Sequence, residues 1–224
     1  GSYLLSRSQS LEELLVALTS GPRDVWVTIP EGFRREQIAQ RFESFDQFDK
    51  SEFLRLTATS EGKLFPDTYL VPLYATAENV VDMLLENFSV KVGEISQNNL
   101  IIASLVEREV RNPADRPVIA GIIIKRLEAG WPLQIDATVQ YVSGNSKDWW
   151  PKQIDTKIPS AYNTYVNVGL PPSPIANPGI KAIEATKSFR ESAYWYYLSD
   201  SQGVTHFAKT LTEHNLNIDK YLID

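Results

Sequence analysis

Two glutamates near the end of an apolar segment, Glu107 and Glu109, are the residues best suited to acid–base chemistry. Residues 100–110 are apolar around most of a helical circumference, which predicts a largely buried helix. At about 100° per residue, Glu107 falls on the one polar stripe, whereas Glu109 falls between isoleucine and leucine side chains. Apolar surroundings raise the pKa of a carboxyl and keep it protonated near neutral pH. Glu109 is therefore a candidate general acid, and Glu107 is expected to be a solvated or salt-bridged surface residue.

Other readings of these polar residues stay open at this point. Glu109 could be a structural carboxylate near a helix end, paired with an arginine. Asp136 could be a second carboxylate, a sugar ligand or a turn former, and local sequence favours the turn. His206 and His214 stand eight positions apart, which does not match metal-ligand spacing, so both are expected to be structural.

A proline-rich segment at residues 159–178 follows these residues. It contains five of the thirteen prolines, two tyrosines, three asparagines and no charged residue. Proline excludes regular helix and central strand, so the segment is expected to be a rigid loop. Rings and amides on a stiff frame suit a polar, uncharged ligand such as a sugar, although a packed structural crossover would look the same.

Composition excludes several classes of function. The chain has no cysteine, which removes thiol catalysis, disulfides and Cys-ligated zinc. Its net charge is −6, and no basic face is available for nucleic acid. No phosphate-binding glycine loop, dinucleotide fingerprint or nucleophile elbow is present. No run of about 18 apolar residues occurs, so this sequence itself contains no membrane span.

The elements that must position these residues fall into two groups. In the first, strands are expected at residues 25–29 and 64–71, with helices at 34–45, 51–56 and 76–88. This strand-helix-helix-strand order makes a compact module. The offsets from Tyr3 to Leu18 repeat those from Tyr69 to Leu84, with Ser10 and Glu13 as a capping box. That partial repeat indicates that residues 1–24 are the tail of a truncated preceding module.

The second group is mostly helical. Helices are expected at residues 98–110, 113–128, 179–189 and 210–222, with mixed structure at 131–142. Residues 145–157, which include Trp149 and Trp150, form a surface excursion, and residues 194–198 and 204–208 form a hairpin. The expected fold class is therefore α+β.

Several segments taken together resemble the YceG-like endolytic murein transglycosylase family (MltG). The resemblance covers the chain from about Val25 onward, in family order. Its segments are Glu61-Gly-Lys-Leu-Phe-Pro-Asp-Thr-Tyr69, Ala103-Ser-Leu-Val-Glu-Arg-Glu109, Ile124-Lys-Arg-Leu127, Pro132-Leu-Gln-Ile-Asp-Ala-Thr-Val-Gln-Tyr141, Ala161-Tyr-Asn-Thr-Tyr165, Gly169-Leu-Pro-Pro172, Asn177-Pro-Gly179 and Glu213-His-Asn215.

The resemblance implies a LysM-like β-α-α-β module at residues 25–95, followed by a mostly helical, lysozyme-like catalytic domain with a β-hairpin at residues 96–224. It implies a peptidoglycan lytic transglycosylase that cleaves the MurNAc–GlcNAc β-1,4 bond inside glycan strands and leaves 1,6-anhydroMurNAc ends. Such an enzyme would act in cell wall assembly and glycan strand termination. The alternatives are a non-catalytic peptidoglycan-binding protein and a water-using glycoside hydrolase.

The resemblance also implies the roles of individual residues. The family's catalytic glutamate aligns with Glu109, and no metal or cofactor is expected. Ala137 and Ser173 depart from the usual proline and glycine, which affects the expected shape of the cleft. The expected partners are glycan strands and peptidoglycan synthases of the elongation or division machinery. A single-pass plasma-membrane anchor is expected in the full-length bacterial protein, with the catalytic domain outside the cytoplasm. The expected substrate-binding residues are Gln134, Asp136, Thr138, Tyr162, Asn163 and Tyr165.

Overall fold

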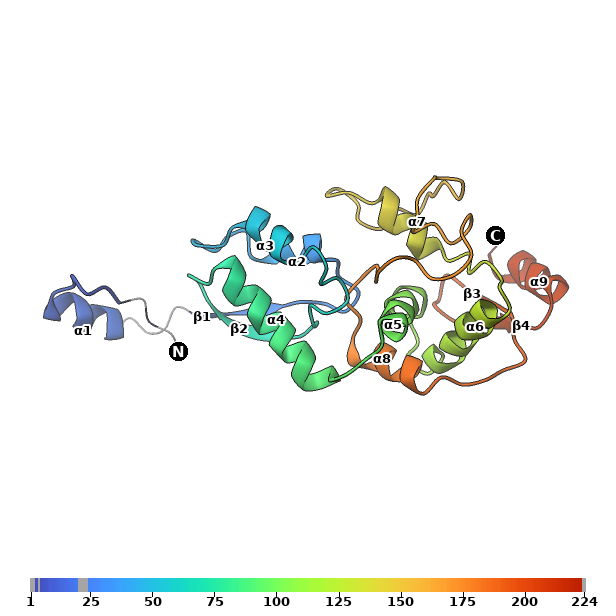
Figure 1. Ribbon diagram of the computed structural model, residues 1–224, viewed down its shortest axis with the longest axis horizontal. Helices are drawn as coiled ribbons and strands as arrows, with labels where there is room; N and C mark the ends of the chain where they lie inside the picture. Colours follow the sequence, from blue (N-terminus) through green and yellow to red (C-terminus); the bar gives the residue numbers. More distant parts are fainter. Residues whose placement is uncertain (1–2, 4, 20–23, 223–224) are drawn as a thin grey trace.

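The computed structural model describes residues 3, 5–19 and 24–222 and has the expected α+β class. Within these residues the strands form two separate two-stranded antiparallel sheets, β1–β2 and β3–β4 (Figure 1). The elements in chain order are α1 (Leu11–Thr19), β1 (Asp24–Thr28), α2 (Arg35–Arg41), α3 (Lys50–Leu56), β2 (Thr68–Pro72), α4 (Ala77–Val92), α5 (Gln97–Glu109), α6 (Arg116–Glu128), α7 (Asp136–Ser143), α8 (Ile180–Lys187), β3 (Tyr196–Ser199), β4 (Thr205–Ala208) and α9 (Leu211–Tyr221).

The first sheet buries one face and exposes the other, as alternation along a strand requires. Val27 pairs with Tyr69, and both are buried in the core under α4. Trp26 pairs with Leu70 on the opposite face, and Trp26 is 70% exposed. A capping box between Thr76 and Asn79 begins α4 and satisfies backbone N–H groups of its first turn.

Helix α2 ends earlier than the sequence predicts. The expected helix runs to residue 45, but α2 stops at Arg41. The next residues form successive four-residue turns, in which Phe45 N–H donates to Phe42 O and Phe48 N–H donates to Phe45 O. Phe45 and Phe48 lie with ring centroids 5.3 and 5.4 Å from Phe42, and this aromatic packing in the core replaces the last helical turn.

The second half packs α5 against α6 and α8 around a separate apolar core, and α9 covers the β3–β4 hairpin (Figure 1). Helix α6 begins at Arg116 rather than at Pro113, because residues 112–116 first form a turn and Pro117 occupies the first turn of the helix. Part of the mixed region is a regular helix, α7. The β3–β4 hairpin lies where the sequence predicts it.

The excursion at residues 145–157 is anchored at its two tryptophans. Trp149 and Trp150 are half-buried. Their indole N–H groups donate to Gln40 and Gln37 of α2, each over 3.3 Å. The Arg108 guanidinium stacks on the Trp150 ring at 3.8 Å. The excursion therefore connects the first module to the end of α5.

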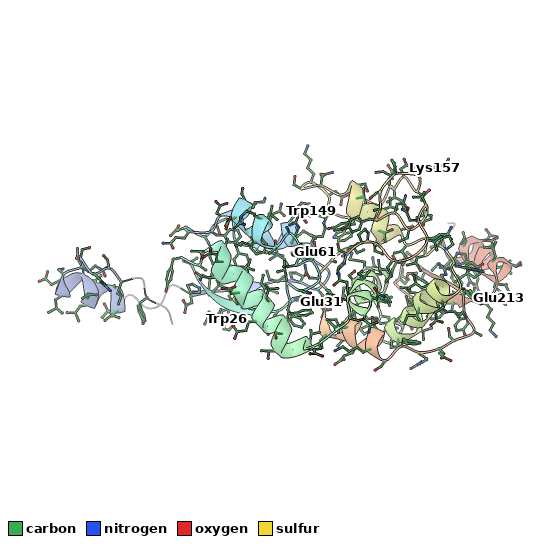
Figure 2. The ribbon with its side chains drawn as sticks, in the orientation of Figure 1. Trp26, Glu31, Glu61, Trp149, Lys157 and Glu213 are labelled. Carbon is green, nitrogen blue, oxygen red and sulfur yellow. The ribbon has the colours of Figure 1, made fainter. Side chains whose placement is uncertain are left out.

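One amide side chain joins the proline-rich segment to the first module. Asn177 is fully buried, and its Oδ1 accepts hydrogen bonds from the backbone N–H groups of Gly62 and Leu64 at 2.8 and 2.9 Å. Its Nδ2 donates to Phe33 O at 2.9 Å and to Glu61 Oε1 at 2.7 Å. Figure 2 labels Glu61 at this junction between the two halves.

The first helix is present, but the segment that connects it to β1 lies outside the described residues. Ser10 N–H donates to Glu13 Oε2 at 2.7 Å, and Glu13 N–H donates to Ser10 Oγ at 3.2 Å, so the predicted capping box is confirmed. Gly1 and Ser2, part of the predicted 1–24 segment, also lie outside the described residues. In the described part of the chain, no helix has the length and hydropathy of a membrane span.

Candidate active site

A cavity of about 580 Å³ brings together residues from both ends of the second half. Its walls come from the end of α5, from α6 and α7, from the proline-rich segment, from β3 and from α9. Its lining residues are Arg108, Glu109, Arg126, Gln134, Asp136, Gln140, Tyr165, Tyr196, Tyr197, Leu198, Ser199, Leu211, His214, Ile218 and Leu222.

Glu109 is the last residue of α5 and lines this cavity, where it is half-buried. Burial first and the negative charge of Asp136 second raise its pKa to about 7. The Tyr197 hydroxyl, which donates to Glu109 Oε2 over 3.2 Å, and the Ala137 backbone N–H oppose the rise. At neutral pH the carboxyl group is therefore divided between protonated and ionised forms, as a group that must donate and then accept a proton requires.

Asp136 is the second carboxylate of the cavity. It is the first residue of α7, where its charge interacts favourably with the helix dipole. The Tyr165 hydroxyl donates to Asp136 Oδ1. Burial, followed by this hydrogen bond, raises the pKa of Tyr165, so its hydroxyl stays protonated and remains a donor. Asp136 is thus held in place from the proline-rich segment.

Gln134 lines the same cavity from the loop that precedes α7. Its φ of 54° is the only positive φ among non-glycine residues in the described ranges. The backbone is fixed by a hydrogen bond of 3.1 Å from Gln134 N–H to Thr164 O. A strained backbone that places an amide in a cavity is typical of a functional position.

The other three predicted substrate-binding residues do not line the cavity. Thr138 and Asn163 are both 0% exposed. Thr138 Oγ1 donates to Ile135 O at 2.7 Å, and Asn163 Nδ2 donates to the carbonyls of residues 156 and 158. The Tyr162 hydroxyl bonds Ser173 Oγ at 2.7 Å, and its ring packs on Tyr141. We interpret these three as residues that shape the proline-rich segment rather than as direct ligands.

Glu107 is salt-bridged, which is one of the two predicted alternatives, but it does not lie on the surface, and this corrects the prediction from the helical stripe. Its side chain is 6% exposed and forms an ion pair with Arg116 over 2.7 Å. Its Oε2 also accepts the Gly179 backbone N–H at 2.9 Å. The polar stripe of α5 faces α6 and the start of α8 instead of water, so Glu107 is a structural residue of the buried core.

Among the polar residues that line the cavity, Tyr197, Arg126 and His214 were not predicted to belong to the site. Tyr197 contacts Glu109 directly, and its position in the predicted hairpin gave no sign of this. Arg126 is buried and donates to Trp195 O at 2.9 Å and to Leu133 O at 2.7 Å, which brings a fixed positive charge to the wall. His214 comes from α9. Its spacing of three and four residues from Leu211 and Ile218, which puts all three on one side of the helix, is the sequence pattern that could have indicated it.

Comparison with known proteins places the whole chain among related sequences. The model of the YceG-like family matches residues 1–220. An endolytic murein transglycosylase of Bacillus subtilis (strain 168) is 32% identical over 262 residues, covering 99% of this chain and 72% of that protein. An endolytic murein transglycosylase of Streptococcus pneumoniae (strain ATCC BAA-255 / R6) is 31% identical over 281 residues, covering 99% of this chain and 50% of that protein, so the chain spans half the length of this relative.

A solved structure is similar as well. The crystal structure of a yceG-like protein from Listeria monocytogenes aligns with a TM-score of 0.72 and 27% sequence identity. The alignment covers 96% of this chain and 83% of that one. The likeness therefore extends over both halves of the fold.

Proposed function

Since the chain belongs to the YceG-like family, we propose that it is an endolytic lytic transglycosylase of peptidoglycan. It cleaves the MurNAc–GlcNAc β-1,4 bond inside glycan strands and produces 1,6-anhydroMurNAc ends, in cell wall assembly and glycan strand termination. The observation that carries the proposal is Glu109, a carboxyl group in the cavity with a pKa of about 7.

Glu109 carries out both proton transfers of the reaction. Its carboxyl proton passes to the glycosidic oxygen, the bond from C1 of MurNAc to that oxygen breaks, and GlcNAc leaves with a free hydroxyl. The Glu109 carboxylate then accepts the proton of the C6 hydroxyl of the same MurNAc while that oxygen bonds to C1. Protons balance without water, so one carboxyl group suffices where a hydrolase needs two.

The remaining residues of the cavity support this chemistry. The Tyr197 hydroxyl orients Glu109, and the charge of Asp136, which is held by Tyr165, favours the protonated form of the acid. Gln134 supplies an amide for sugar hydroxyls. Thr138, Tyr162 and Asn163 fix the wall that carries Tyr165.

The broader context belongs to the same proposal. Residues 25–95 form a LysM-like module and residues 96–224 form a lysozyme-like catalytic domain, while residues 1–24 are the tail of a preceding module. Two of the three apolar clusters, one within residues 25–85 and the other within residues 101–207, support these boundaries. The full-length protein is held at the plasma membrane by a single-pass anchor, faces the cell wall and works beside peptidoglycan synthases.

Product analysis of purified sacculi tests the proposal. The wild-type protein is expected to release anhydro-muropeptides, identified by mass spectrometry, and Glu109→Gln is expected to lower the rate about 10³-fold. Glu128→Gln, an exposed glutamate at the end of α6, is the matched control and is expected to keep full activity. Anhydro products from Glu109→Gln at the wild-type rate would refute the assignment.

Because Asp136 lines the same cavity as Glu109, a second candidate function is hydrolysis of the glycosidic bond. A water-using glycoside hydrolase would use Glu109 as acid and Asp136 as the second carboxylate, and its products would carry reducing ends. Asp136→Asn separates the two, because it abolishes such a hydrolase but leaves anhydro-ring formation measurable at acidic pH. A purely glycan-binding protein would release neither product.

A further inference from the structure

Helix α9 presents an apolar stripe with one polar residue to the cavity. Leu211, His214, Ile218 and Leu222 follow at intervals of three and four, so they share one side of the helix and of the turn that ends it, and all four line the cavity. Leu211 and Leu222 are 56% and 51% exposed, which is costly unless a ligand covers them. Figure 2 labels the neighbouring Glu213 on this helix, at the end of the molecule far from the first module.

The imidazole of His214 is fixed but not saturated with hydrogen bonds. Its ring stacks on Tyr196 with centroids 5.3 Å apart and an interplanar angle of 24°. Nδ1 is buried and has no hydrogen-bond partner among the described residues. Burial and the charge of Arg126 lower the pKa of His214, so the ring is neutral at pH 7. Because Nδ1 is buried without a partner and His214 lines the cavity, we assign the proton of the neutral ring to Nε2, the nitrogen left to meet a ligand there.

We propose that His214, flanked by Leu211 and Ile218, is a subsite for the N-acetyl group of an amino sugar bound in the cavity. An acetamide has a methyl group and a strong carbonyl acceptor side by side. The stripe has the complementary parts, an N–H donor between aliphatic side chains. The contact makes the acetamide, rather than the sugar hydroxyls, the group that α9 recognises. The inference deepens the proposed function by naming a residue that selects its substrate.

The test compares normal sacculi with sacculi de-N-acetylated by a peptidoglycan deacetylase. De-N-acetylation is expected to lower kcat/KM of the wild-type protein about tenfold, as the loss of one neutral hydrogen bond and a methyl contact predicts. His214→Phe keeps the stacking on Tyr196 but removes both nitrogens. The kcat/KM of this variant is expected to be about tenfold below wild type on normal sacculi and to fall no further on de-N-acetylated sacculi. Chemical re-acetylation of the sacculi should restore the wild-type rate.

The proposal would be overturned if the effects of His214→Phe and of de-N-acetylation on kcat/KM were independent and multiplied to about 100-fold. Wild-type activity of His214→Phe on normal sacculi would overturn it as well. His206→Phe is the matched control, because His206 also stacks on a tyrosine but does not line the cavity. It is expected to keep the wild-type preference for acetylated sacculi. Thermal melting of each variant confirms that it is folded.

A binding measurement separates this inference from the proposed reaction. In the Glu109→Gln background, calorimetry with tetra-N-acetylchitotetraose is expected to give about tenfold tighter binding than with the glucosamine tetramer. Adding His214→Phe should remove that difference. Failure of this result overturns the acetamide subsite whatever products the wild-type protein forms. Reducing ends in the product analysis would instead refute the transglycosylase mechanism.

Discussion

Replacing Asp136 with asparagine changes the charge beside the catalytic acid while preserving its shape. Asparagine still accepts the Tyr165 hydroxyl through its carbonyl oxygen, so the wall of the cavity keeps its geometry. The pKa of Glu109 is raised to about 7 by burial first and by Asp136 second. Loss of the second contribution should lower that pKa by about one pH unit, to about 6, because burial remains.

The effect on activity follows from the protonated fraction of Glu109. With a pKa of about 7, about half of the enzyme carries the acid proton at pH 7, and with a pKa of about 6, about a tenth does. Asp136→Asn should therefore reduce kcat/KM about fivefold at pH 7 and very little at pH 5. Initial rates of anhydro-muropeptide release, measured from pH 4.5 to 8.5, should show the alkaline limb displaced downward by about one pH unit.

An unchanged alkaline limb would refute the electrostatic role of Asp136. An equal loss at pH 5 and pH 7 would show instead that Asp136 acts by contact with the substrate or the transition state. Glu128→Gln changes an exposed carboxylate outside the cavity and should leave the whole profile in place.

Three further predictions concern the groups around the site. Tyr197→Phe removes the hydroxyl that orients Glu109 and should lower kcat about tenfold with little change in KM, measured on sacculi. Burial raises the pKa of Glu61 to about 8, above its ordinary value in the unfolded chain, so the fold loses stability as pH rises from about 4.5 to 8. Glu61→Gln should therefore increase the free energy of unfolding by up to about 5 kcal/mol at pH 8 and leave it unchanged at pH 4, measured by urea unfolding. Arg116→Met leaves Glu107 buried without its ion-pair partner and should cost about 3 to 5 kcal/mol in the same measurement.

Each of these has a result that would contradict it. A KM effect alone for Tyr197→Phe would place the tyrosine in substrate binding. An equal change in the free energy of unfolding at pH 4 and pH 8 would show that Glu61 acts through packing or hydrogen bonding and not through its charge. Wild-type stability of Arg116→Met would mean that Glu107 is satisfied by Gly179 alone.

Sequence patterns predicted the elements well where a period was clear. β1, α4 and the hairpin β3–β4 lie close to their expected positions, β2 begins at Thr68 rather than at residue 64, and the α+β class is confirmed. The end of α2 was wrong because three phenylalanines at spacing three fit an aromatic cluster as well as a helix. Local periodicity cannot distinguish those outcomes, since the choice depends on packing between distant elements.

The site was predictable only in part, for the same reason. Glu109, Gln134, Asp136 and Tyr165 share one cavity, as the predicted motifs required, although their substrate contacts remain predictions. Glu107 was misplaced because a helical wheel reports the side of a helix but not what covers that side. Tyr197 and His214 reach the cavity through the fold of the last 30 residues, and their spacing to Glu109 along the chain carries no information about that approach.

The hydrogen bonds of the Asn177 side chain to the first module determine whether the two halves of this protein can be produced separately. This single amide satisfies two backbone N–H groups and one carbonyl of the first module, and Gly62 packs so closely on Pro174 that a Cβ would lie 2.7 Å from it. A fragment that begins at residue 96 would leave these groups without partners on both sides of the cut. Heat should therefore melt residues 24–222 in a single calorimetric transition. A chimera that exchanges the first module must carry the residue 174–179 segment with it.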